Sequence, residues 1–412
     1  MPYASDVRLT EEERAMLAGE AGSAVRKAME IVVALARIYG ARHLVPVESV
    51  QVAGVSYKNL GDAGLQFLRE WADEGARARV PAFLNPAGMD LQRWKELGIP
   101  EDFARAQAAV IEAYTRMGIA PSLTCTPYYI GLRPAFGSHV AWSESSAVSF
   151  ANSVLGARTN REGGPSALAA AIAGRTGAYG LHLDESRRAT CLIEVRAPMR
   201  SIADVGALGA LAGGLVRDGI PYFRGLDLSW TRRPEEALKA LGAAMAASGA
   251  VALYHVEGVT PEAGLPDTLP AGIPRFVIHD LTAGYQKLNG PLEEIDLVSL
   301  GCPHASLEEL GEMARFLAGR HVRTRLWITT ARQVREQAER AGIVAQIEAA
   351  GGQVVADTCV IVAPVELLGV RSLATNSAKA ALYARSHSGL ETRFGTTEQC
   401  LEAALTGHWR GP

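Results

Sequence analysis

Residues 295–309 read Ile-Asp-Leu-Val-Ser-Leu-Gly-Cys-Pro-His-Ala-Ser-Leu-Glu-Glu. The apolar run at 295–300 predicts a buried strand, and Ser306 with Glu309 forms a capping box that predicts a helix ending at Ala318. The polar turn Gly301-Cys302-Pro303-His304 lies between the two. Parallel α/β sheets present their binding residues in loops of this kind, directly after a strand. This stretch therefore predicts an α/β fold with functional side chains at the ends of its strands.

The rest of the last third repeats this alternation. The pattern predicts strands at 324–329, 353–356 and 369–374, and helices at 331–342 and 397–405. The strand at 353–356 leads to Cys359, and the strand at 369–374 leads to Thr375-Asn376-Ser377 at a predicted helix start. Each polar motif thus follows a predicted strand, where a parallel sheet places its binding residues.

The first two thirds mix helices and strands less regularly. Helical spacing occurs at 10–39, where Thr10 and Glu13 form a capping box, and at 103–118, 145–155, 166–173, 205–216 and 234–248. Strand-like patterns occur at 43–53, 80–84, 192–197, 223–230 and 251–256, and a polar turn is predicted at 54–62. We expect one catalytic unit over residues 1–412 with parallel or mixed sheets, and approximate sub-domains at 1–120, 121–270 and 271–412.

The composition is that of a soluble globular protein. The chain has 412 residues, of which 48% are hydrophobic, and a mean hydropathy of +0.06. The formal net charge of -3 provides no basic face for nucleic acid. No run approaches the roughly 18 apolar residues of a membrane span, and the acidic start lacks the apolar region of a signal peptide. We therefore expect a cytoplasmic protein with no nucleic-acid or membrane partner.

The cysteines are too few and too scattered for a disulfide framework. There are five of them, Cys125, Cys191, Cys302, Cys359 and Cys400, and none forms a Cys-x-x-Cys pair. Cys125, Cys302 and Cys359 each follow a predicted strand and lie in a polar loop. Three thiolates can hold an iron-sulfur cluster and leave one iron open to substrate. From the residues alone, three unrelated buried thiols explain the pattern better than a metal site.

Residues 122–165 concentrate polar side chains in a chain otherwise rich in Ala, Leu and Val. Arg158 and Arg161 lie just before the helix predicted at 166–173. Free N–H groups at a helix start and the forked guanidinium group both suit a carboxylate. The alternative for Arg161 is a salt bridge with Glu162 or Glu144. In the turn at 54–62, Tyr57 and Lys58 offer groups that reach a carboxylate or a phosphate. The alternative is an ordinary exposed turn, which for Lys58 alone is equally well supported.

Six separated motifs resemble the large, catalytic part of the aconitase X family, within the aconitase superfamily of iron-sulfur dehydratases. They occur in the family's order along the chain. The motifs are Gly-Val-Ser-Tyr-Lys-Asn-Leu-Gly-Asp at 54–62, Asn-Pro-Ala-Gly-Met-Asp at 85–90, the polar stretch at 122–165, Gly-Cys-Pro-His at 301–304, Ala-Asp-Thr-Cys at 356–359 and Ala-Thr-Asn-Ser at 374–377.

The resemblance implies that sub-domains of the aconitase type close around a central cluster held by Cys125, Cys302 and Cys359. This reverses the preference for three unrelated thiols. Aconitase itself uses a Cys-x-x-Cys pair plus one distant Cys. Because this chain has no such pair, the cluster type stays open among 2Fe-2S, 3Fe-4S and 4Fe-4S.

We expect the remaining site residues to come from the same motifs. The candidate catalytic residues are Ser145, His139 and Glu144. The candidate substrate-binding residues are Ser56, Tyr57, Lys58, Arg158, Thr159, Asn160, Arg161, Asn376 and Ser377.

The function implied by the resemblance is the removal of water from a small hydroxy acid. Similar proteins act on cis-3-hydroxy-L-proline, mainly in bacteria, or on mevalonate 5-phosphate in archaea. Arginine far outnumbers lysine here, and on this lineage argument we expect the hydroxyproline substrate, with mevalonate 5-phosphate as the alternative. A non-catalytic metal- or cluster-binding structural subunit is an explanation of another class.

The resemblance also implies a partner. Aconitase-type enzymes complete their site with a small swivelling domain, which in this family is fused to the chain or supplied as a separate subunit. Only a predicted helix and a short tail follow Gly395, and a domain of about 50 residues does not fit there or before Gly54. We therefore expect the large subunit of a heterodimer, with the swivel domain absent from this chain.

Overall fold

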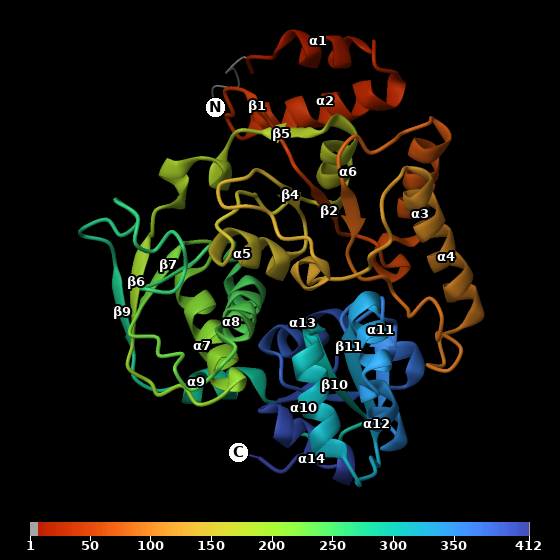
Figure 1. The fold of residues 1–412 in the computed structure, drawn as a ribbon, viewed down its shortest axis with the longest axis vertical. Helices are drawn as coiled ribbons and strands as arrows, with labels where there is room; N and C mark the ends of the chain where they lie inside the picture. The colour runs from red at the N-terminus through yellow and green to blue at the C-terminus, as the bar shows by residue number, and fades with distance from the viewer. Residues whose placement is uncertain (1–6, 412) are drawn as a thin grey trace.

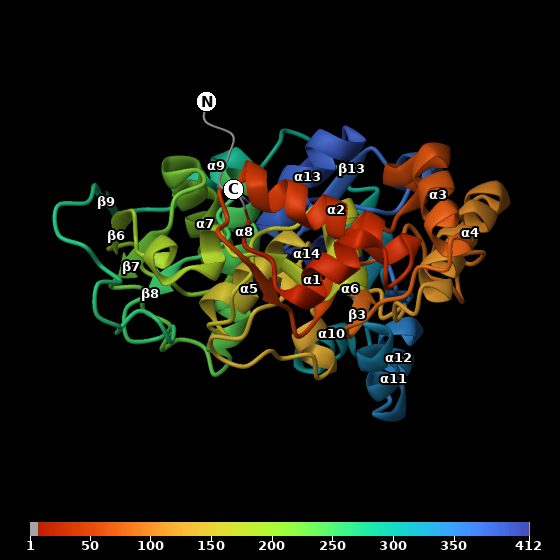
Figure 2. The ribbon, with the colours of Figure 1, turned by 90° about the horizontal axis from the view of Figure 1, so that it is seen from above.

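The computed structural model describes residues 7–411, which form three parts arranged around the middle of the molecule (Figure 1). The first part ends near residue 187, the second spans 191–288 and the third begins near residue 295. Seen from above, the helices of 57–116 lie at one edge of the molecule and the strands of 191–278 lie at the other (Figure 2). Within residues 7–411, no helix is long and apolar enough to cross a membrane.

The first part contains a three-stranded parallel sheet in the order β3 (Ala82–Leu84), β2 (Val50–Val52) and β4 (Ala141–Trp142). A second, antiparallel pair joins β1 (Leu44–Pro46) to β5 (Arg175–Gly177). The helices of this part are α1 (Glu11–Ala18), α2 (Ser23–Ile38), α3 (Tyr57–Asp73), α4 (Glu101–Arg116), α5 (Ser145–Ser153) and α6 (Gly164–Ala173).

Two predictions for this part are wrong in detail. The single helix predicted at 10–39 is two helices, because Gly19 (φ 91°) ends α1 and Gly22 (φ 100°) precedes α2, both with the positive φ that glycine adopts most readily. The turn predicted at 54–62 instead begins α3 directly after Ser56, and Gly61 (φ 59°) kinks that helix. The capping box of α1 is confirmed.

The second part is a four-stranded parallel sheet in the order β8 (His255–Val256), β7 (Pro221–Arg224), β6 (Cys191–Val195) and β9 (Arg275–Ile278). Its helices are α7 (Ile202–Val216), α8 (Pro234–Gly249) and α9 (Thr282–Leu288). The strand predicted at 223–230 ends at Arg224, because Gly225 takes a φ of 76° and turns the chain. Of the strand predicted at 251–256, only the last two residues pair.

The third part is a five-stranded parallel sheet in the order β12 (Gln353–Ala356), β11 (Arg325–Thr330), β10 (Leu297–Ala305), β13 (Ser372–Thr375) and β14 (Glu391–Phe394). Its helices are α10 (Leu307–Leu317), α11 (Arg332–Arg340), α12 (Ile343–Ala349), α13 (Ala378–Ser388) and α14 (Thr397–Thr406). The predicted alternation and the capping box at the start of α10 are confirmed, whereas β14 was not predicted. Short 3-10 helices lie at Pro127–Ile130, Gly180–His182, Asp184–Arg187 and Val365–Leu368.

The strand β10 does not stop at the Gly-Cys-Pro-His turn, as the sequence predicted, but continues past it. Leu300 pairs with Ile328 and Ala305 pairs with Thr330, so residues 301–304 bulge out of the ladder. Gly301 (φ 84°) makes the bulge possible, because a Cβ atom at this position would lie 2.1 Å from the carbonyl oxygen of Thr329. The bulge places Cys302 inside the protein rather than on an exposed turn.

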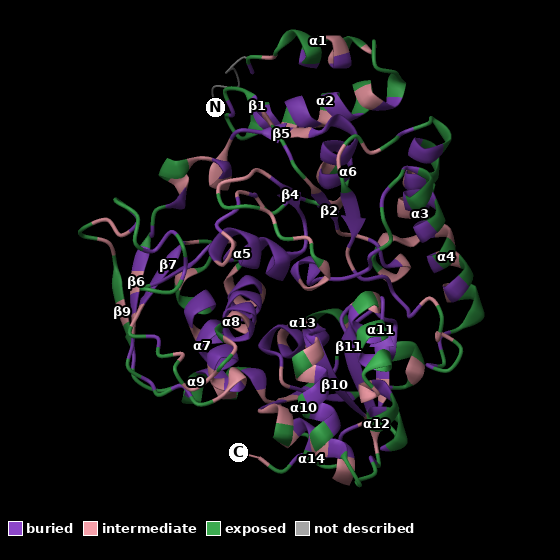
Figure 3. Cartoon of the chain, in the orientation of Figure 1, coloured by how far each residue is buried: buried purple, intermediate pink, exposed green. Residues whose placement is uncertain are grey.

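The helix α5 lies where the three parts meet and is buried along its whole length (Figures 1 and 3). Its sequence, Ser-Ser-Ala-Val-Ser-Phe-Ala-Asn-Ser, is unusually polar for a buried helix. Some of its polar side chains form hydrogen bonds with other parts of the protein. Asn152 donates hydrogen bonds of 2.9 Å to the carbonyl oxygens of Thr159 and Ala252 and accepts one of 3.0 Å from the amide of Thr159. A buried polar helix at a junction of sub-domains indicates a functional site there.

Candidate active site

A cavity of about 410 Å³ lies between the first and third parts, beside the start of α5. Loops that follow strands form part of its wall, as the sequence predicted for the binding residues, and α13 supplies Lys379, Tyr383 and His387. The polar, charged and sulfur-containing side chains that line it are Ser56, Asn59, Asn85, Cys125, Ser143, Glu144, Ser145, Arg161, Cys302, Cys359, Lys379, Tyr383 and His387.

Three of the five cysteines meet at this cavity. Cys125 lies just before the 3-10 helix Pro127–Ile130, Cys302 lies in the bulge of β10, and Cys359 follows β12. All three are buried, with 5%, 8% and 6% of their surface exposed. Cys191 lies in β6 and Cys400 lies in α14, and neither lines the cavity. Three separate loops thus bring three thiols to one place.

The donor set fits an iron-sulfur cluster. Burial raises the pKa of Cys125 well above its usual value, that of Cys302 to about 12 and that of Cys359 above its usual value, so the free thiols are neutral. Within residues 7–411, no three His, Cys, Asp or Glu side chains close on one metal ion. A cluster needs a different arrangement of ligands, because its separate iron atoms bind separate thiolates. Three buried thiols around a cavity provide that arrangement.

A buried ion pair lies beside the cysteines. The ammonium group of Lys379 contacts Glu144 and Ser146, and the side chains of Lys379 and Glu144 are only 7% and 6% exposed. Burial alone would raise the pKa of Glu144, but Lys379 and the hydrogen bonds from Ser146 and Ala147 hold it below its usual value. Burial alone would lower the pKa of Lys379, but the charge of Glu144 raises it above its usual value. Both groups are therefore charged, and both line the cavity together with the three cysteines.

Lys379 was missed by the sequence analysis, although a signal was present. It lies two residues after Ser377, which caps α13 through a hydrogen bond of 3.0 Å from the amide of Ala380. A cation in the first turn of a helix opposes the helix dipole. Its position there indicates a compensating anion, which is Glu144.

Two hydroxyl groups and one amide oxygen face the cavity with spare hydrogen-bonding capacity. Ser145 donates a bond of 3.3 Å to Glu144. Within the described chain, Oγ of Ser143 and Oδ1 of Asn85 are buried without a hydrogen-bond partner. Buried polar atoms without partners are rare and indicate a missing ligand or water.

Arg161 is the exposed cation at this cavity. Among residues 7–411 its guanidinium group makes no hydrogen bond or ion pair that would hold it in place. The two carboxylates considered as its partners are occupied elsewhere. Glu162 accepts bonds from Ser166 at 2.6 Å and Thr176 at 3.1 Å, and Glu144 pairs with Lys379. The guanidinium group is therefore free to meet an anionic substrate.

Four predicted site residues from the polar stretch do not line the cavity. Nδ1 of His139 lies 2.9 Å from Nδ1 of His182, and Arg158 forms an ion pair with Asp184. Thr159 accepts a bond of 3.0 Å from the amide of Trp142, and Asn160 donates one of 2.9 Å to the carbonyl oxygen of Tyr179. These contacts fix the loop that carries Arg161.

Of the three predicted site residues in the 54–62 segment, Ser56 lines the cavity, whereas Tyr57 and Lys58 do not. Ser56 lines the cavity and donates a bond of 2.8 Å to the carbonyl oxygen of Val362. Lys58 instead forms an ion pair of 2.8 Å with Glu366, and the hydroxyl group of Tyr57 bonds to Asp62 at 2.8 Å. Ser56 and Lys58 thus join the first part to the third beside the cavity.

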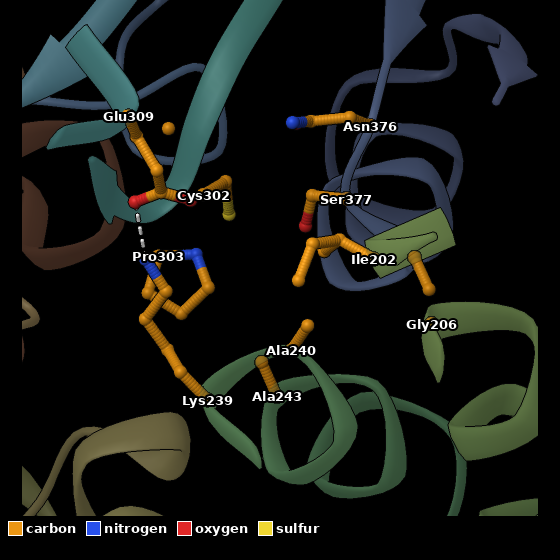
Figure 4. A pocket seen from close by; sticks show the side chains of 12 residues that line it. Ile202, Gly206, Lys239, Ala240, Ala243, Cys302, Pro303, Glu309, Asn376 and Ser377 are labelled. Carbon is orange, nitrogen blue, oxygen red and sulfur yellow. Dashed lines mark hydrogen bonds and ion pairs between the residues drawn. The ribbon is translucent and has the colours of Figure 1, made fainter. Parts of the chain in front are cut away.

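Asn376 and Ser377 lie on the other side of Cys302. They line a pocket of about 20 Å³ together with Cys302 and Pro303, opposite the ion pair between Lys239 and Glu309 (Figure 4). This pocket is large enough for about one water molecule and not for a substrate. The two residues therefore contact the rear of the cysteine loop in this structure.

The sequence matches three family models described as the aconitase X first domain at residues 6–185, the second domain at 189–281 and the third domain at 295–406. The crystal structure of aconitase X from Thermococcus kodakaraensis in its holo-form aligns with a TM-score of 0.89 at 46% identity, covering 97% of this chain and 100% of that chain. The resemblance found in the motifs and the predicted fold class are confirmed.

The relatives carry two names. A phosphomevalonate dehydratase large subunit from Methanothermobacter thermautotrophicus is 51% identical over 397 residues, covering 94% of this chain and 96% of the relative. A cis-3-hydroxy-L-proline dehydratase from Pseudomonas aeruginosa is 41% identical over 415 residues, covering 97% of this chain and 70% of the relative. Both names describe dehydratases, which favours an enzyme over a purely structural subunit. These matches show that the chain belongs to the aconitase X family of hydro-lyases, as a large subunit.

Proposed function

We propose that this chain is the large subunit of an iron-sulfur dehydratase that removes water from mevalonate 5-phosphate. A single observation carries this proposal: three buried thiols share one cavity with a buried Lys-Glu ion pair and an unpaired guanidinium group. The thiols suit a cluster, and the guanidinium group suits an anionic substrate.

Cys125, Cys302 and Cys359 would hold the cluster, because the other two cysteines do not line the cavity. When bound through three cysteines, such a cluster supplies a Lewis-acidic iron that polarises the hydroxyl group of a hydroxy acid. The overall reaction removes a proton from the carbon next to the carboxylate through a base and breaks the C–O bond of the adjacent carbon, and the hydroxyl group takes up one proton as it leaves as water, so that the base is returned to its starting state overall.

The chain's own groups divide into binding and orienting roles. Arg161 binds the carboxylate or phosphate of the substrate, because it is the free guanidinium group at the cavity. Glu144 is a weak base with a lowered pKa, so it orients Lys379 and Ser145 rather than abstracting a proton. The unpartnered Ser143 hydroxyl and Ser145 remain to contact substrate oxygens. By family analogy, a serine-type base comes from a small swivel-domain subunit that closes the cavity over the substrate and excludes water.

The substrate assignment differs from the one expected from composition. The excess of arginine over lysine has no bearing on the cavity, where Arg161 and Lys379 are both present. The relatives named phosphomevalonate dehydratase large subunit include the more similar proteins, and the first two match over 96% and 99% of their own length. The hydroxyproline relatives match over 70% and 69% of theirs, so they contain further sequence. This favours mevalonate 5-phosphate, with cis-3-hydroxy-L-proline as the second candidate.

The decisive experiment assays both substrates with the anaerobically reconstituted chain, alone and together with a small swivel-domain subunit encoded in the same genome. We expect dehydration of mevalonate 5-phosphate by the pair and weak activity of the chain alone, because half of the site stays open to water. Preference for cis-3-hydroxy-L-proline would reverse the substrate assignment. Full activity of the single chain would refute the need for a partner, and zinc without sulfide in the purified protein would refute the cluster.

Arg161→Ala should raise the KM for the acidic substrate and lower kcat/KM by about 10- to 100-fold, since a hydrogen bond to a charged group contributes about 1.5–3 kcal/mol. Steady-state kinetics of the reconstituted pair measure this effect. Arg158→Ala is the matched control, because Arg158 lies in the same loop but is bound to Asp184 outside the cavity. Equal KM values for the Arg161 variant and the unmodified protein would remove Arg161 from the substrate site.

A further inference from the structure

His304 lies two residues after Cys302 and is completely buried, yet it does not line the cavity. Its imidazole ring reaches the two other cysteine loops. Nδ1 lies 3.0 Å from the hydroxyl oxygen of Thr124, the residue before Cys125. Nε2 lies 3.0 Å from the carbonyl oxygen of Thr358, the residue before Cys359. The ring therefore contacts the residues that precede Cys125 and Cys359, and His304 itself follows Cys302 by two residues in the chain.

The chemistry of the partners fixes the direction of both hydrogen bonds. The carbonyl oxygen of Thr358 can only accept, so Nε2 of His304 carries the proton. Nδ1 lies within hydrogen-bonding distance of the hydroxyl group of Thr124, which can donate to it. The Thr124 oxygen in turn accepts a bond of 3.1 Å from the amide of Thr126, which leaves its proton free for the imidazole. Every polar atom of the ring and of its Thr124 partner is thus used.

The backbone of His304 adds two further contacts. Its amide donates a bond of 3.3 Å to Sγ of Cys125. On the opposite side, the carbonyl oxygen of His304 lies 3.5 Å from the ammonium group of Lys239, which is held by Glu309 at 2.7 Å (Figure 4). The residue is therefore anchored from α8 and α10 while it spans the cysteine loops.

We propose that His304 is the positioning residue that sets the mutual placement of Cys125, Cys302 and Cys359 for binding an iron-sulfur cluster. The three cysteines come from loops separated by more than 50 residues in the chain, and of the elements that carry them only β10 and β12 pair with a common strand, β11. The imidazole ring is the side chain that bonds next to two of them and follows the third. Outer hydrogen-bond partners of metal ligands typically change metal affinity by about 10–100-fold when they are removed.

This inference rests on the proposed function only in assuming that the three cysteines bind a cluster. His304→Leu keeps the volume of the ring and removes both side-chain bonds. His304→Gln keeps a donor near the position of Nε2, and His304→Asn keeps an acceptor near that of Nδ1. Neither amide spans both loops, so each restores at most one of the two bonds.

His255→Leu is the matched control. His255 is 1% exposed, burial lowers its pKa, and its Nε2 bonds to the carbonyl oxygen of Arg187 at 2.8 Å, as Nε2 of His304 bonds to Thr358. It lies in β8 of the second part and contacts no cysteine loop. Its replacement should cost stability in the same way without changing cluster binding.

The experiment reconstitutes each full-length variant anaerobically with iron and sulfide. It measures iron and sulfide per chain, the visible circular-dichroism spectrum, and the rate of iron loss to a chelator. We expect His304→Leu to lose iron at least about 10-fold faster and with an altered spectrum, the two amide variants to fall between, and His255→Leu to match the unmodified protein.

Two results would overturn the inference. The first is that His304→Leu retains iron as long as the unmodified protein does and shows the same visible circular-dichroism spectrum. If the leucine variant does not fold, the same result in both amide variants would overturn the inference. The second is an equal loss of iron in His255→Leu at a matched melting temperature. If the unmodified chain itself binds no iron and sulfide, the proposed function fails instead, so the two failures are distinguishable.

Discussion

Cys302→Ala should abolish dehydration and cluster binding together. Removing one of three thiolates leaves two protein ligands at the cavity, too few for the cluster arrangement implied by the family, so the Lewis acid is lost. We expect kcat/KM to fall by at least about 10³-fold, since several kcal/mol of transition-state stabilisation are removed. Iron and sulfide per chain should fall in parallel.

Cys400→Ala and Cys191→Ala are the controls for this result. Both cysteines are as buried as Cys302 but lie in α14 and β6, away from the cavity. Their loss should cost about 1 kcal/mol of stability or less through a small void, with unchanged iron content and activity. Normal iron and sulfide content in Cys302→Ala, measured alongside these controls, would show that the cluster is held in another way.

Much of the fold was predictable because its signals are local. The capping boxes at Thr10 and Ser306 and the alternation of strands and helices in the last third depend on residues within one or two turns of each other. The errors in the fold are local too. The break near Gly19 and the bulge at Gly301 both depend on a positive φ, which a glycine permits but its presence alone does not predict.

Part of the candidate site was predictable because its side chains lie in recognisable motifs. The three cysteines and Arg161 line the cavity, as do Ser56, Glu144 and Ser145, which also bind partners within the chain. His139 and Arg158 looked equally suitable, but His182 and Asp184 bind them, and neither partner is marked by spacing in the sequence. Lys379 was missed because its partner Glu144 is 235 residues away. Pairing across sub-domains is a property of the folded chain.

The first and third parts are joined by hydrogen bonds next to Cys359. Asp90, in the 85–90 motif, accepts bonds from Arg332 at 2.7 Å and from the amide of Ala356 at 2.9 Å. The amide of Ala87 bonds to the carbonyl oxygen of Asp357 at 2.8 Å. The loop that carries Cys359 is thus held by the first part as well as by its own strand. The 85–90 motif therefore supports the site through these bonds, although its charged residue, Asp90, does not line the cavity.

Lys379→Met should unfold the protein more readily and inactivate it. The substitution leaves the buried Glu144 carboxylate without its cation, and breaking one side of a buried ion pair typically costs about 3–5 kcal/mol. Chemical denaturation of the apo chain should therefore show a free energy of unfolding lower by about that amount. Glu144→Gln should lose stability for the same reason, because it leaves the buried ammonium group unpaired.

The double variant Lys379→Met with Glu144→Gln separates stability from function. With both charges removed, no uncompensated charge stays buried, so we expect the double variant to recover much of the stability lost by either single variant. Activity should not recover, because the cation beside the cysteines and the carboxylate that orients Ser145 are both absent. Glu262→Gln, which breaks the buried pair with Arg187 outside the cavity, is the control and should lower stability without lowering kcat of the folded enzyme. Restored activity in the stable double variant would show that the ion pair only supports the fold, and would leave Ser143, Ser145 and the partner subunit to perform the chemistry.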